Sequence, residues 1–281
     1  MEQAMKGKVC LVTGATSGIG KETAIGLARM GATIVFTTRD DWRGETTRQD
    51  IVRASGNQNI EPYLCDLSSL ESIRAFNTKL RVTHDRLHVL VNNAGIWERE
   101  RKLSKDNVEL TWAVNVLAPF LMTRLLLDLL ETGAPSRVVN LSSGLHVGGQ
   151  LDLEDPEFHK RPFDGSAAYR QSKVAVILFT KELARRLEGR NITANAVAPG
   201  WVATNLSRNA GAFSRFIMNR MAARPAKGAL TSIHVASAAE VEGITGKYFT
   251  DRQAAESSPE SGDMEKAAKL WELCEMQTTP K

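Results

Sequence analysis

Short apolar runs alternate along the chain with longer segments whose apolar residues recur at helical spacing. Such short runs, bounded by turn residues, are typical of buried parallel strands, and the longer segments are typical of helices that cover a sheet. The alternation predicts a doubly wound parallel α/β sheet with helices on both faces. Strands are expected at 9–12, 33–37, 61–64, 87–91, 137–141 and 192–197, and helices at 21–30, 43–54, 69–82, 106–131 and 167–188.

Composition agrees with one globular unit. The 281 residues fit a single domain, 1–281, and hydrophobic residues make up 42% of them, so a disordered chain is excluded. Cys10, Cys65 and Cys274 are widely spaced without metal-ligand spacing, so we expect reduced thiols, no metal and a cytoplasmic protein. Neither a transmembrane segment nor a signal-peptide core is visible. Basic and aromatic residues do not interleave, which argues against nucleic-acid binding.

A glycine turn follows the first predicted strand. Gly14, Gly18 and Gly20 stand between that strand and a helical segment that ends near Gly31. Glycines let the backbone approach a pyrophosphate, and a helix N-terminus presents free N–H groups to it. The spacing Gly-x-x-x-Gly-x-Gly differs from the Gly-x-Gly-x-x-Gly fingerprint. The turn indicates a phosphate site, and a plain glycine turn is the alternative.

The segment Tyr169-Arg-Gln-Ser-Lys173 places a phenol and an ammonium four residues apart on a predicted helix. Residues at this spacing are neighbours on a helix surface. A free phenol has a pKa of about 10, and a nearby cation lowers that value. The pair is therefore a candidate proton donor with its activator.

Together these motifs resemble the short-chain dehydrogenase/reductase family, and the resemblance covers nearly the whole chain. The family landmarks occur in family order, and they are the glycine turn at 13–20, Asp66, Asn92-Asn-Ala-Gly95, Asn115, Ser142-Ser143, Tyr169 with Lys173, and Pro199-Gly200. The resemblance implies a Rossmann-type fold that binds a nicotinamide dinucleotide at the carboxyl ends of the strands.

The resemblance also implies roles for individual residues. Tyr169 would be the general acid in carbonyl reduction, and Lys173 would lower its pKa and bind the nicotinamide ribose. Ser143, preferred here to Ser142, would hydrogen-bond the substrate oxygen, and Asn115 would hold a water that links Lys173 to solvent. The residues expected to contact the cofactor are Gly14, Thr16, Ser17, Gly18, Ile19, Gly20, Thr38, Arg39, Asp66, Leu67, Asn92, Ala94, Gly95, Tyr169, Lys173, Pro199, Gly200, Val202 and Thr204.

The end of the second strand favours NADP over NAD. An acidic residue there would bind the ribose hydroxyls of NAD, whereas an arginine accommodates the 2′-phosphate of NADP. Thr38 occupies the acidic position of the family, and Arg39 follows it. The alternative is a solvated arginine that pairs with Asp40 or Asp41.

Three further segments go beyond the shared pattern. A long insert that contains His159 lies between Ser143 and Tyr169. His159 and nearby His146 are expected to be structural or at the surface. The insert and the C-terminal pattern resemble the retinol-dehydrogenase-like branch of the family, which includes relatives of the WW-domain oxidoreductase. Residues 201–227 are expected to form a substrate lid. A C-terminal helix at 263–276 is expected to pack on its own subunit, to close over the active site or to join a homodimer interface.

The lid sequence is basic and partly apolar. Between Trp201 and Ala239 there is no acidic residue, and Phe213, Phe216 and Ile217 share a helical face. This face is expected to cover a hydrophobic substrate or touch lipid headgroups, with core packing as the alternative.

The sequence thus predicts an NADP-dependent oxidoreductase that interconverts an alcohol and a carbonyl group on a hydrophobic small molecule. A non-catalytic NADP(H)-binding sensor or scaffold is the alternative from another functional class. A protochlorophyllide-reductase-like activity is a more distant one.

Overall fold

The computed structural model describes residues 3–199 and 225–280. Within these residues the chain forms an eight-stranded sheet in the order β3-β2-β1-β4-β5-β6-β7-β8, parallel except for the antiparallel pair β7–β8. This is a Rossmann-type α/β fold, as the sequence predicts. The strands are β1 (Val9–Val12), β2 (Thr33–Thr38), β3 (Ile60–Leu64), β4 (Val89–Asn92), β5 (Ser136–Leu141), β6 (Ile192–Ala198), β7 (Tyr248–Thr250) and β8 (Gln253–Ala255).

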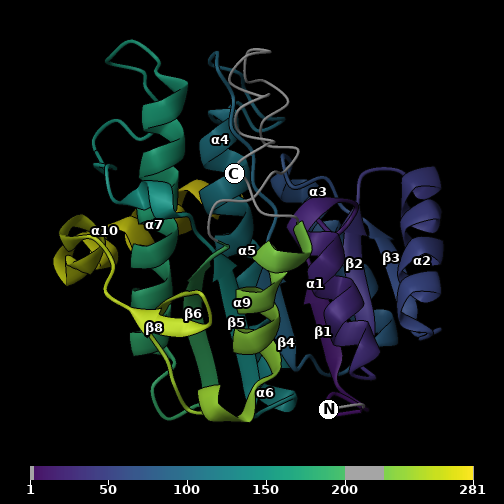
Figure 1. Cartoon of the computed structure of the whole chain (residues 1–281). Helices are drawn as coiled ribbons and strands as arrows, with labels where there is room; N and C mark the ends of the chain where they lie inside the picture. Colours follow the sequence, from purple (N-terminus) through teal and green to yellow (C-terminus); the bar gives the residue numbers. More distant parts are fainter. Residues whose placement is uncertain (1–2, 200–224, 281) are drawn as a thin grey trace.

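Helices cover both faces of the sheet (Figure 1). One face carries α1 (Gly18–Arg29), α2 (Asp41–Ser55) and α9 (Pro225–Ser237), and the other carries α3 (Leu70–Thr83), α5 (Ala118–Leu125), α7 (Gly165–Arg186) and α10 (Met264–Thr278). Side chains of β1 alternate between the two cores, since Cys10 and Val12 join the first and Leu11 joins the second. The sheet is therefore buried on both faces, which explains its continuous apolar strands.

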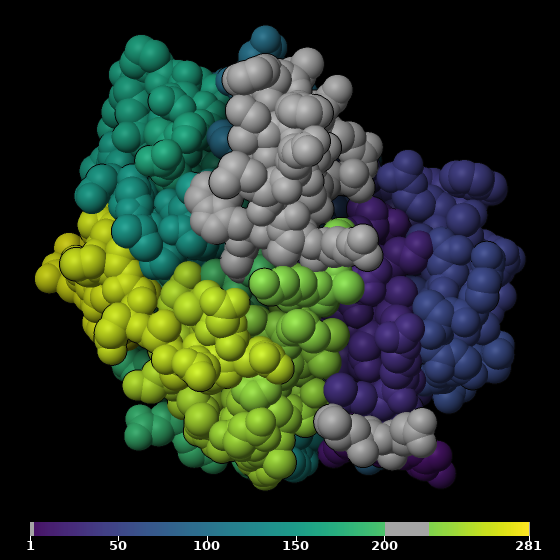
Figure 2. Space-filling model, viewed as in Figure 1, coloured from purple at the N-terminus to yellow at the C-terminus, as the bar shows by residue number. Residues whose placement is uncertain are grey.

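Helix α9 is an element that the sequence prediction missed. It lies beside α1, and the space-filling view shows the two surfaces adjoining (Figure 2). A Cβ at Gly26 of α1 would lie 2.3 Å from Cδ1 of Ile233, so the glycine permits this close approach. Strands β7 and β8, which extend the sheet beyond β6, were also missed.

The single helix predicted at 106–131 is wrong in its start and its continuity. The carboxylate of Glu109 accepts hydrogen bonds from the main-chain N–H groups of Thr111 and Trp112, which starts helix α4 (Leu110–Trp112). A π-helical turn, η1 (Ala113–Leu117), then leads into α5, and α6 (Leu127–Thr132) follows. The helical period therefore changes around Asn115, which lies in η1.

The C-terminal helix α10 packs on its own subunit, one of the three arrangements left open by the sequence. Its indole at Trp271 lies 4.9 Å from the ring of Phe120 and 5.9 Å from that of Phe179. Asp263 caps the helix by accepting a hydrogen bond from the Lys266 main-chain N–H. The predicted lid residues Phe213, Phe216 and Ile217 lie outside the described residues.

Candidate active site

The glycine turn between β1 and α1 brings two backbone segments into contact. Gly14 has φ +68°, and a Cβ there would lie 2.9 Å from the Cα of Ala94. A Cβ at Gly20 would lie 2.3 Å from Nδ2 of Asn93 and 2.5 Å from the carbonyl oxygen of Gly14. Only glycine fits at both positions, so the turn presents bare backbone at the end of β1.

Asn93, which belongs to the family landmark at 92–95 but was not among the residues expected to contact the cofactor, braces this turn. Its Nδ2 donates to the carbonyl oxygen of Thr13 at 2.8 Å, and its main-chain N–H donates to the Thr13 hydroxyl at 3.0 Å. The Ala94 main-chain N–H reaches the same hydroxyl at 3.1 Å. The loop after β4 therefore holds the glycine turn in place, while the Asn92 amide points into the sheet toward Thr123 and Asn140.

The N-terminus of α1 has features that suit an anion. Ser17 is its N-cap residue but makes no side-chain capping bond, and the first turn holds no acidic residue. The Ser17 side chain therefore caps none of the first N–H groups of α1, and no carboxylate in the first turn offsets the positive end of the helix dipole. With the bare turn next to it, this end of α1 fits the pyrophosphate of a dinucleotide.

Polar residues at the end of β2 separate into a buried and an exposed set. Thr38 is buried, and its hydroxyl donates to the carbonyl oxygen of Asp40 at 2.9 Å. The Asp40 carboxylate caps α2 by accepting from the Arg43 main-chain N–H at 2.7 Å. Arg39 is exposed, and within the described part of the chain it forms no ion pair with Asp40 or Asp41. The alternative pairing considered from the sequence is therefore absent among these residues.

A hollow lies beside the glycine turn, between the loops after β3 and β4 and the helical segment from η1 to α5. Its walls come from Thr13, Leu67, Asn92, Ala94, Val114 and Met122. The carboxylate of Asp66, next to Leu67, accepts hydrogen bonds from the Ser68 hydroxyl at 2.7 Å and pairs with the Lys105 ammonium at 2.9 Å. Leu67, Asn92 and Ala94, predicted to contact the cofactor, thus share one surface.

Tyr169 and Lys173 lie one turn apart on α7, and both are buried. The Lys173 ammonium lies 5.5 Å from the centre of the Tyr169 ring and donates a hydrogen bond to the Leu141 carbonyl at 2.9 Å. Burial raises the pKa of Tyr169 to about 12, which an interaction with the Ser143 hydroxyl opposes. Burial also lowers the pKa of Lys173 to about 8. The predicted lowering of the phenol pKa by Lys173 is therefore not present in this structure, because desolvation dominates and only the Ser143 hydroxyl opposes it.

Asn115 is buried in the π-helical turn, and its amide holds the loop after β4. Its Oδ1 accepts from the Ile96 main-chain N–H at 2.8 Å, and its Nδ2 donates to the Ile96 carbonyl at 3.0 Å. Nδ2 also donates to the Ser172 hydroxyl on α7 at 3.0 Å. A Cβ at Gly95 would lie 3.2 Å from the Lys173 ammonium and 3.4 Å from Asn115 Oδ1. The side chains of Asn115 and Lys173 therefore both pack against Gly95.

The two serines after β5 have different surroundings. Ser142 is buried, and its hydroxyl donates to the main-chain carbonyl of Lys173 at 2.9 Å. Ser143 is half-buried, and its hydroxyl interacts with Tyr169. Of the two, Ser143 is the serine whose side chain faces the phenol.

Trp97 is a residue of the site that the sequence interpretation missed. Its half-buried indole stacks on the Tyr169 ring with centres 5.4 Å apart and planes at 22°. Both neighbours of Trp97 are held, since Asn115 binds Ile96 and a Cβ at Gly165 would lie only 2.1 Å from the Glu98 carbonyl oxygen. No local sequence signal places an aromatic residue against Tyr169, because the contact depends on these long-range constraints.

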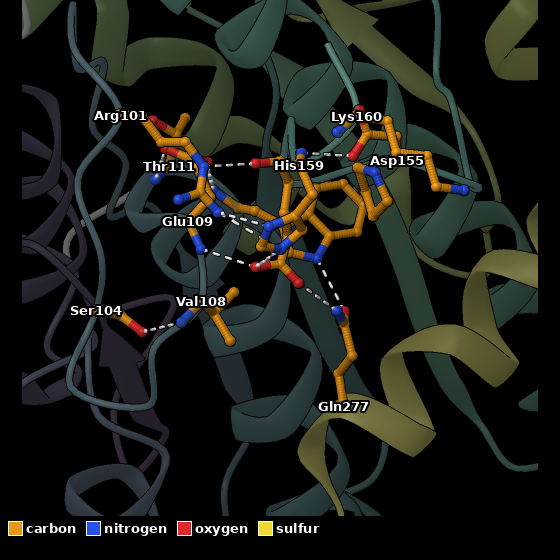
Figure 3. A network of polar contacts seen from close by, with 12 residues as sticks. Arg101, Ser104, Val108, Glu109, Thr111, Asp155, His159, Lys160 and Gln277 are labelled. Atoms are coloured by element: carbon orange, nitrogen blue, oxygen red, sulfur yellow. Dashed lines mark hydrogen bonds and ion pairs between the residues drawn. The ribbon is translucent and has the colours of Figure 1, made fainter. Parts of the chain in front are cut away.

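The insert between Ser143 and Tyr169 is tied into the fold by a polar network (Figure 3). Glu157 accepts from the Glu109 main-chain N–H at 3.0 Å and from Gln277 of α10 at 2.8 Å. Arg101 donates to the Glu157 carbonyl at 3.0 Å and lies beside His159. His159 therefore has a structural place at the surface, as expected, and the network joins the insert to the C-terminal helix.

The remaining predicted cofactor residues follow β6. Pro199 is placed directly after that strand, whereas Gly200, Val202 and Thr204 lie outside the described residues. Among residues 3–199 and 225–280, no helix is both long and apolar enough to cross a membrane.

Comparison with known proteins identifies the family. The sequence model of the short chain dehydrogenase family matches residues 8–214. Retinol dehydrogenase 13 of Mus musculus is 41% identical over 273 residues, which cover 94% of this chain and 82% of that protein. A solved protein of Mycobacterium paratuberculosis superposes with a TM-score of 0.81 at 32% identity, covering 97% of this chain and 94% of its own.

A short chain dehydrogenase of Burkholderia cenocepacia, solved in complex with NADP, superposes with a TM-score of 0.70 at 28% identity. The match covers 88% of this chain and 97% of that one. The chain therefore belongs to the short-chain dehydrogenase family, in its retinol-dehydrogenase-like branch. It is an NAD(P)-dependent oxidoreductase that interconverts alcohols and carbonyl compounds.

Proposed function

We propose that this short-chain dehydrogenase uses NADP(H) to interconvert a hydrophobic alcohol and its carbonyl compound, with Tyr169 as the proton donor and acceptor. The observation that carries the proposal is the convergence of Tyr169, Lys173 and Ser143 beside the glycine turn. A bound nicotinamide would supply the hydride chemistry. The protein residues would orient the substrate oxygen and move its proton.

The proton step follows from the hydroxyls at the site. In carbonyl reduction Tyr169 donates its phenolic proton to the substrate oxygen, and Ser143 donates a hydrogen bond to the same oxygen as negative charge develops. The nearby Lys173 ammonium stabilises the phenolate that remains. In alcohol oxidation the phenolate accepts the proton. Asn115 holds the Ile96 loop and the Ser172 hydroxyl, which keeps the Lys173 side of the site fixed.

Tyr169→Phe tests the proton donor. The variant keeps the ring and its stacking on Trp97 but loses the hydroxyl, so turnover should fall by about 10² or more while NADPH affinity stays close to that of the wild type. Steady-state kinetics and fluorescence titration with NADPH measure the two quantities. Turnover at the wild-type rate would exclude Tyr169 as the donor.

The preference for NADP(H) rests on the end of β2. Thr38 leaves no carboxylate to repel a 2′-phosphate, Asp40 is engaged in capping α2, and the exposed guanidinium of Arg39 suits bidentate phosphate binding. The NADP complex of the Burkholderia cenocepacia relative supports the same choice. Gly14, Gly20 and the α1 N-terminus would hold the pyrophosphate of either cofactor, so they do not discriminate.

Arg39→Ala tests this preference. It should weaken NADPH binding by about 2–3 kcal/mol, the scale of hydrogen bonds to a charged group, or about 30-fold to 150-fold, and leave NADH binding nearly unchanged. Arg53→Ala is the matched control, since Arg53 is an exposed arginine on α2 that pairs with Asp50 at 3.6 Å. Equal losses for NADPH and NADH would show that Arg39 does not bind the 2′-phosphate.

The hydrophobic substrate class rests on Trp97 and on the relatives. The indole covers one side of the Tyr169 ring, so a substrate that reaches the phenol lies against an aromatic surface. The curated relatives are named as dehydrogenases of retinol, an apolar alcohol. Following NADPH oxidation with short, long and aromatic aldehydes tests the class, and a preference for small polar aldehydes would contradict it.

A further inference from the structure

His146 lies three residues after Ser143, at the end of the 3₁₀ turn Gly144–His146, and its side chain is only 1% exposed. Its Nδ1 lies 2.7 Å from the carbonyl oxygen of Ser143, and its Nε2 lies 3.1 Å from the main-chain nitrogen of Ser258. A carbonyl oxygen only accepts a hydrogen bond, and a peptide N–H only donates one. The imidazole is therefore neutral with its proton on Nδ1, and each ring nitrogen has one partner.

The Nδ1 bond acts on the residue that faces the phenol. The Ser143 carbonyl accepts from Nδ1 and from the main-chain N–H of His146, the latter at 3.2 Å. The Ser143 hydroxyl oxygen accepts from the Leu145 N–H at 3.2 Å. Since that oxygen accepts this bond, its own proton points into the site, where the hydroxyl interacts with Tyr169 and would donate to a substrate oxygen. The direction of this donation depends on the main chain that His146 holds.

The Nε2 bond acts on a different part of the molecule. Ser258 follows β8, and its segment has further ties, because Lys181 donates to the Ser257 hydroxyl at 3.0 Å and Glu260 accepts from the Leu151 N–H at 3.0 Å. The ring of Tyr248 lies 4.9 Å from the imidazole and supports it from β7. The bond to Ser258 therefore adds to an existing anchorage, whereas the bond to Ser143 is the imidazole's link to the active site.

We propose that His146 is a positioning residue of the reaction, whose Nδ1–H holds the Ser143 carbonyl and so fixes the direction in which the Ser143 hydroxyl donates to the substrate oxygen. The inference rests on the proposed role of Ser143. Burial lowers the pKa of His146, which favours the neutral ring that this arrangement needs. His146 itself does not contact the substrate and transfers no proton.

Two substitutions separate the two bonds of the imidazole. In His146→Asn the amide nitrogen can replace Nδ1 and keep the bond to Ser143, whereas in His146→Gln the longer amide can replace Nε2 and keep the bond to Ser258. Both remove the ring that contacts Tyr248, so they are matched in lost packing. We expect His146→Gln to lower kcat about tenfold with an unchanged KM for NADPH, a smaller effect than the roughly 10²–10³ of a lost oxyanion donor. His146→Asn should stay within about threefold of the wild type, on the same scale of effects.

Ser258→Pro provides a control for the anchoring bond; it also removes the Ser258 hydroxyl, which donates to the Ser261 hydroxyl at 3.1 Å and lies away from Ser143 in the fold's C-terminal segment. Ser258 has φ −58°, which proline adopts, and proline lacks the N–H that Nε2 accepts. This variant should lose thermal stability and keep kcat. It stays informative if either His146 variant fails to fold, since a loss of kcat here would overturn the assignment by showing that the Ser258 bond supports catalysis.

The Ser143→Ala background completes the test. If His146 acts through Ser143, adding His146→Gln to Ser143→Ala should lower kcat no further. Any of three results would overturn the inference. The first is that the kcat losses of Ser143→Ala and His146→Gln multiply in the double variant; the second is equal kcat losses in His146→Asn and His146→Gln. The third is a wild-type kcat in His146→Gln. NADPH turnover by the wild-type enzyme is measured first and tests the proposed function separately. If the wild type turns over and one of these results is found, only the role of His146 is refuted.

Discussion

Replacing Lys173 by methionine should remove a pH-dependent contribution to stability that the buried ammonium creates. Lys173 is 3% exposed, and burial lowers its pKa from 10.5 to about 8. Between these values the unfolded chain binds a proton that the folded protein has released. Stability from this group therefore rises as pH increases from about 8 to about 10.5. The interval corresponds to roughly 3 kcal/mol at about 1.36 kcal/mol per pH unit.

Other buried groups act in the opposite direction at high pH. Burial raises the pKa values of Cys10 and Cys65 to about 12 each, and that of Tyr169 to about 12. Their unfolded forms lose protons before the folded forms do, so these groups make stability fall as pH rises through the unfolded values. The wild-type curve alone therefore does not show the effect of Lys173. The difference between wild type and Lys173→Met does, because the other groups are common to both.

Urea denaturation of the cofactor-free proteins at pH values from 7 to 10.5, followed by far-ultraviolet circular dichroism, measures this difference. The free energy of unfolding of the wild type minus that of Lys173→Met should rise by about 3 kcal/mol between pH 8 and 10.5, with equal m-values in the two proteins. Saturating NADP⁺ should move the rise to higher pH if the ammonium binds the nicotinamide ribose. A flat difference without cofactor would refute the argument that burial depresses the pKa of Lys173.

Two further substitutions test the walls of the site. Gly20→Ala should lower the melting temperature and abolish cofactor binding, because a Cβ there would lie 2.3 Å from Asn93 Nδ2. Gly262→Ala is the control and should change neither quantity, because no atom lies within 4 Å of its added Cβ. Unchanged NADPH affinity in Gly20→Ala would argue against the turn as a phosphate site. Trp97→Ala should raise KM for aromatic aldehydes about tenfold, the effect of about 1.4 kcal/mol of lost aromatic contact, and Trp97→Phe should restore most of it. Equal KM values in the alanine and phenylalanine variants would exclude stacking as the source of affinity.

Much of the fold could be predicted because its signals are local. Strands β1, β2 and β4 are short, mostly apolar runs that are buried on both faces of the sheet, whereas β3 is an edge strand and is only partly buried. Strand β7 has only three residues, Tyr248–Thr250, and its partner β8 is exposed, so neither forms a recognisable run. Helix α9 buries Gly228, Ala229 and Ser232 against its neighbours rather than a stripe of large apolar residues. At the contact with α1 the small residue is Gly26, which accommodates Ile233 of α9. Because most buried residues of α9 are small, the helix lacks the stripe by which amphipathic helices are found.

The same distinction applies to the site. Tyr169 and Lys173 could be paired from their spacing on one helix, and their shared burial follows from the position of α7 against the sheet. Their altered pKa values could not, because desolvation depends on what covers them. Trp97 was assigned no role, and His146 was expected only to be structural or at the surface, for a similar reason: their partners lie on other elements. Long-range contacts of this kind carry no local sequence pattern.

The contact between β5 and α7 explains how the site keeps a buried ammonium near a phenol. Lys173 is bound at both ends, since its main-chain carbonyl accepts from the Ser142 hydroxyl and its ammonium donates to the Leu141 carbonyl. These bonds tie the last residues of β5 to the middle of α7, and Ser143 comes next along the chain. The bonds that satisfy Lys173 in the interior therefore also set the distance between Ser143 and Tyr169. The packing of β5 against α7 therefore determines two properties at once. It fixes the position of the Tyr169 proton donor, and it buries the Lys173 ammonium at a cost in free energy.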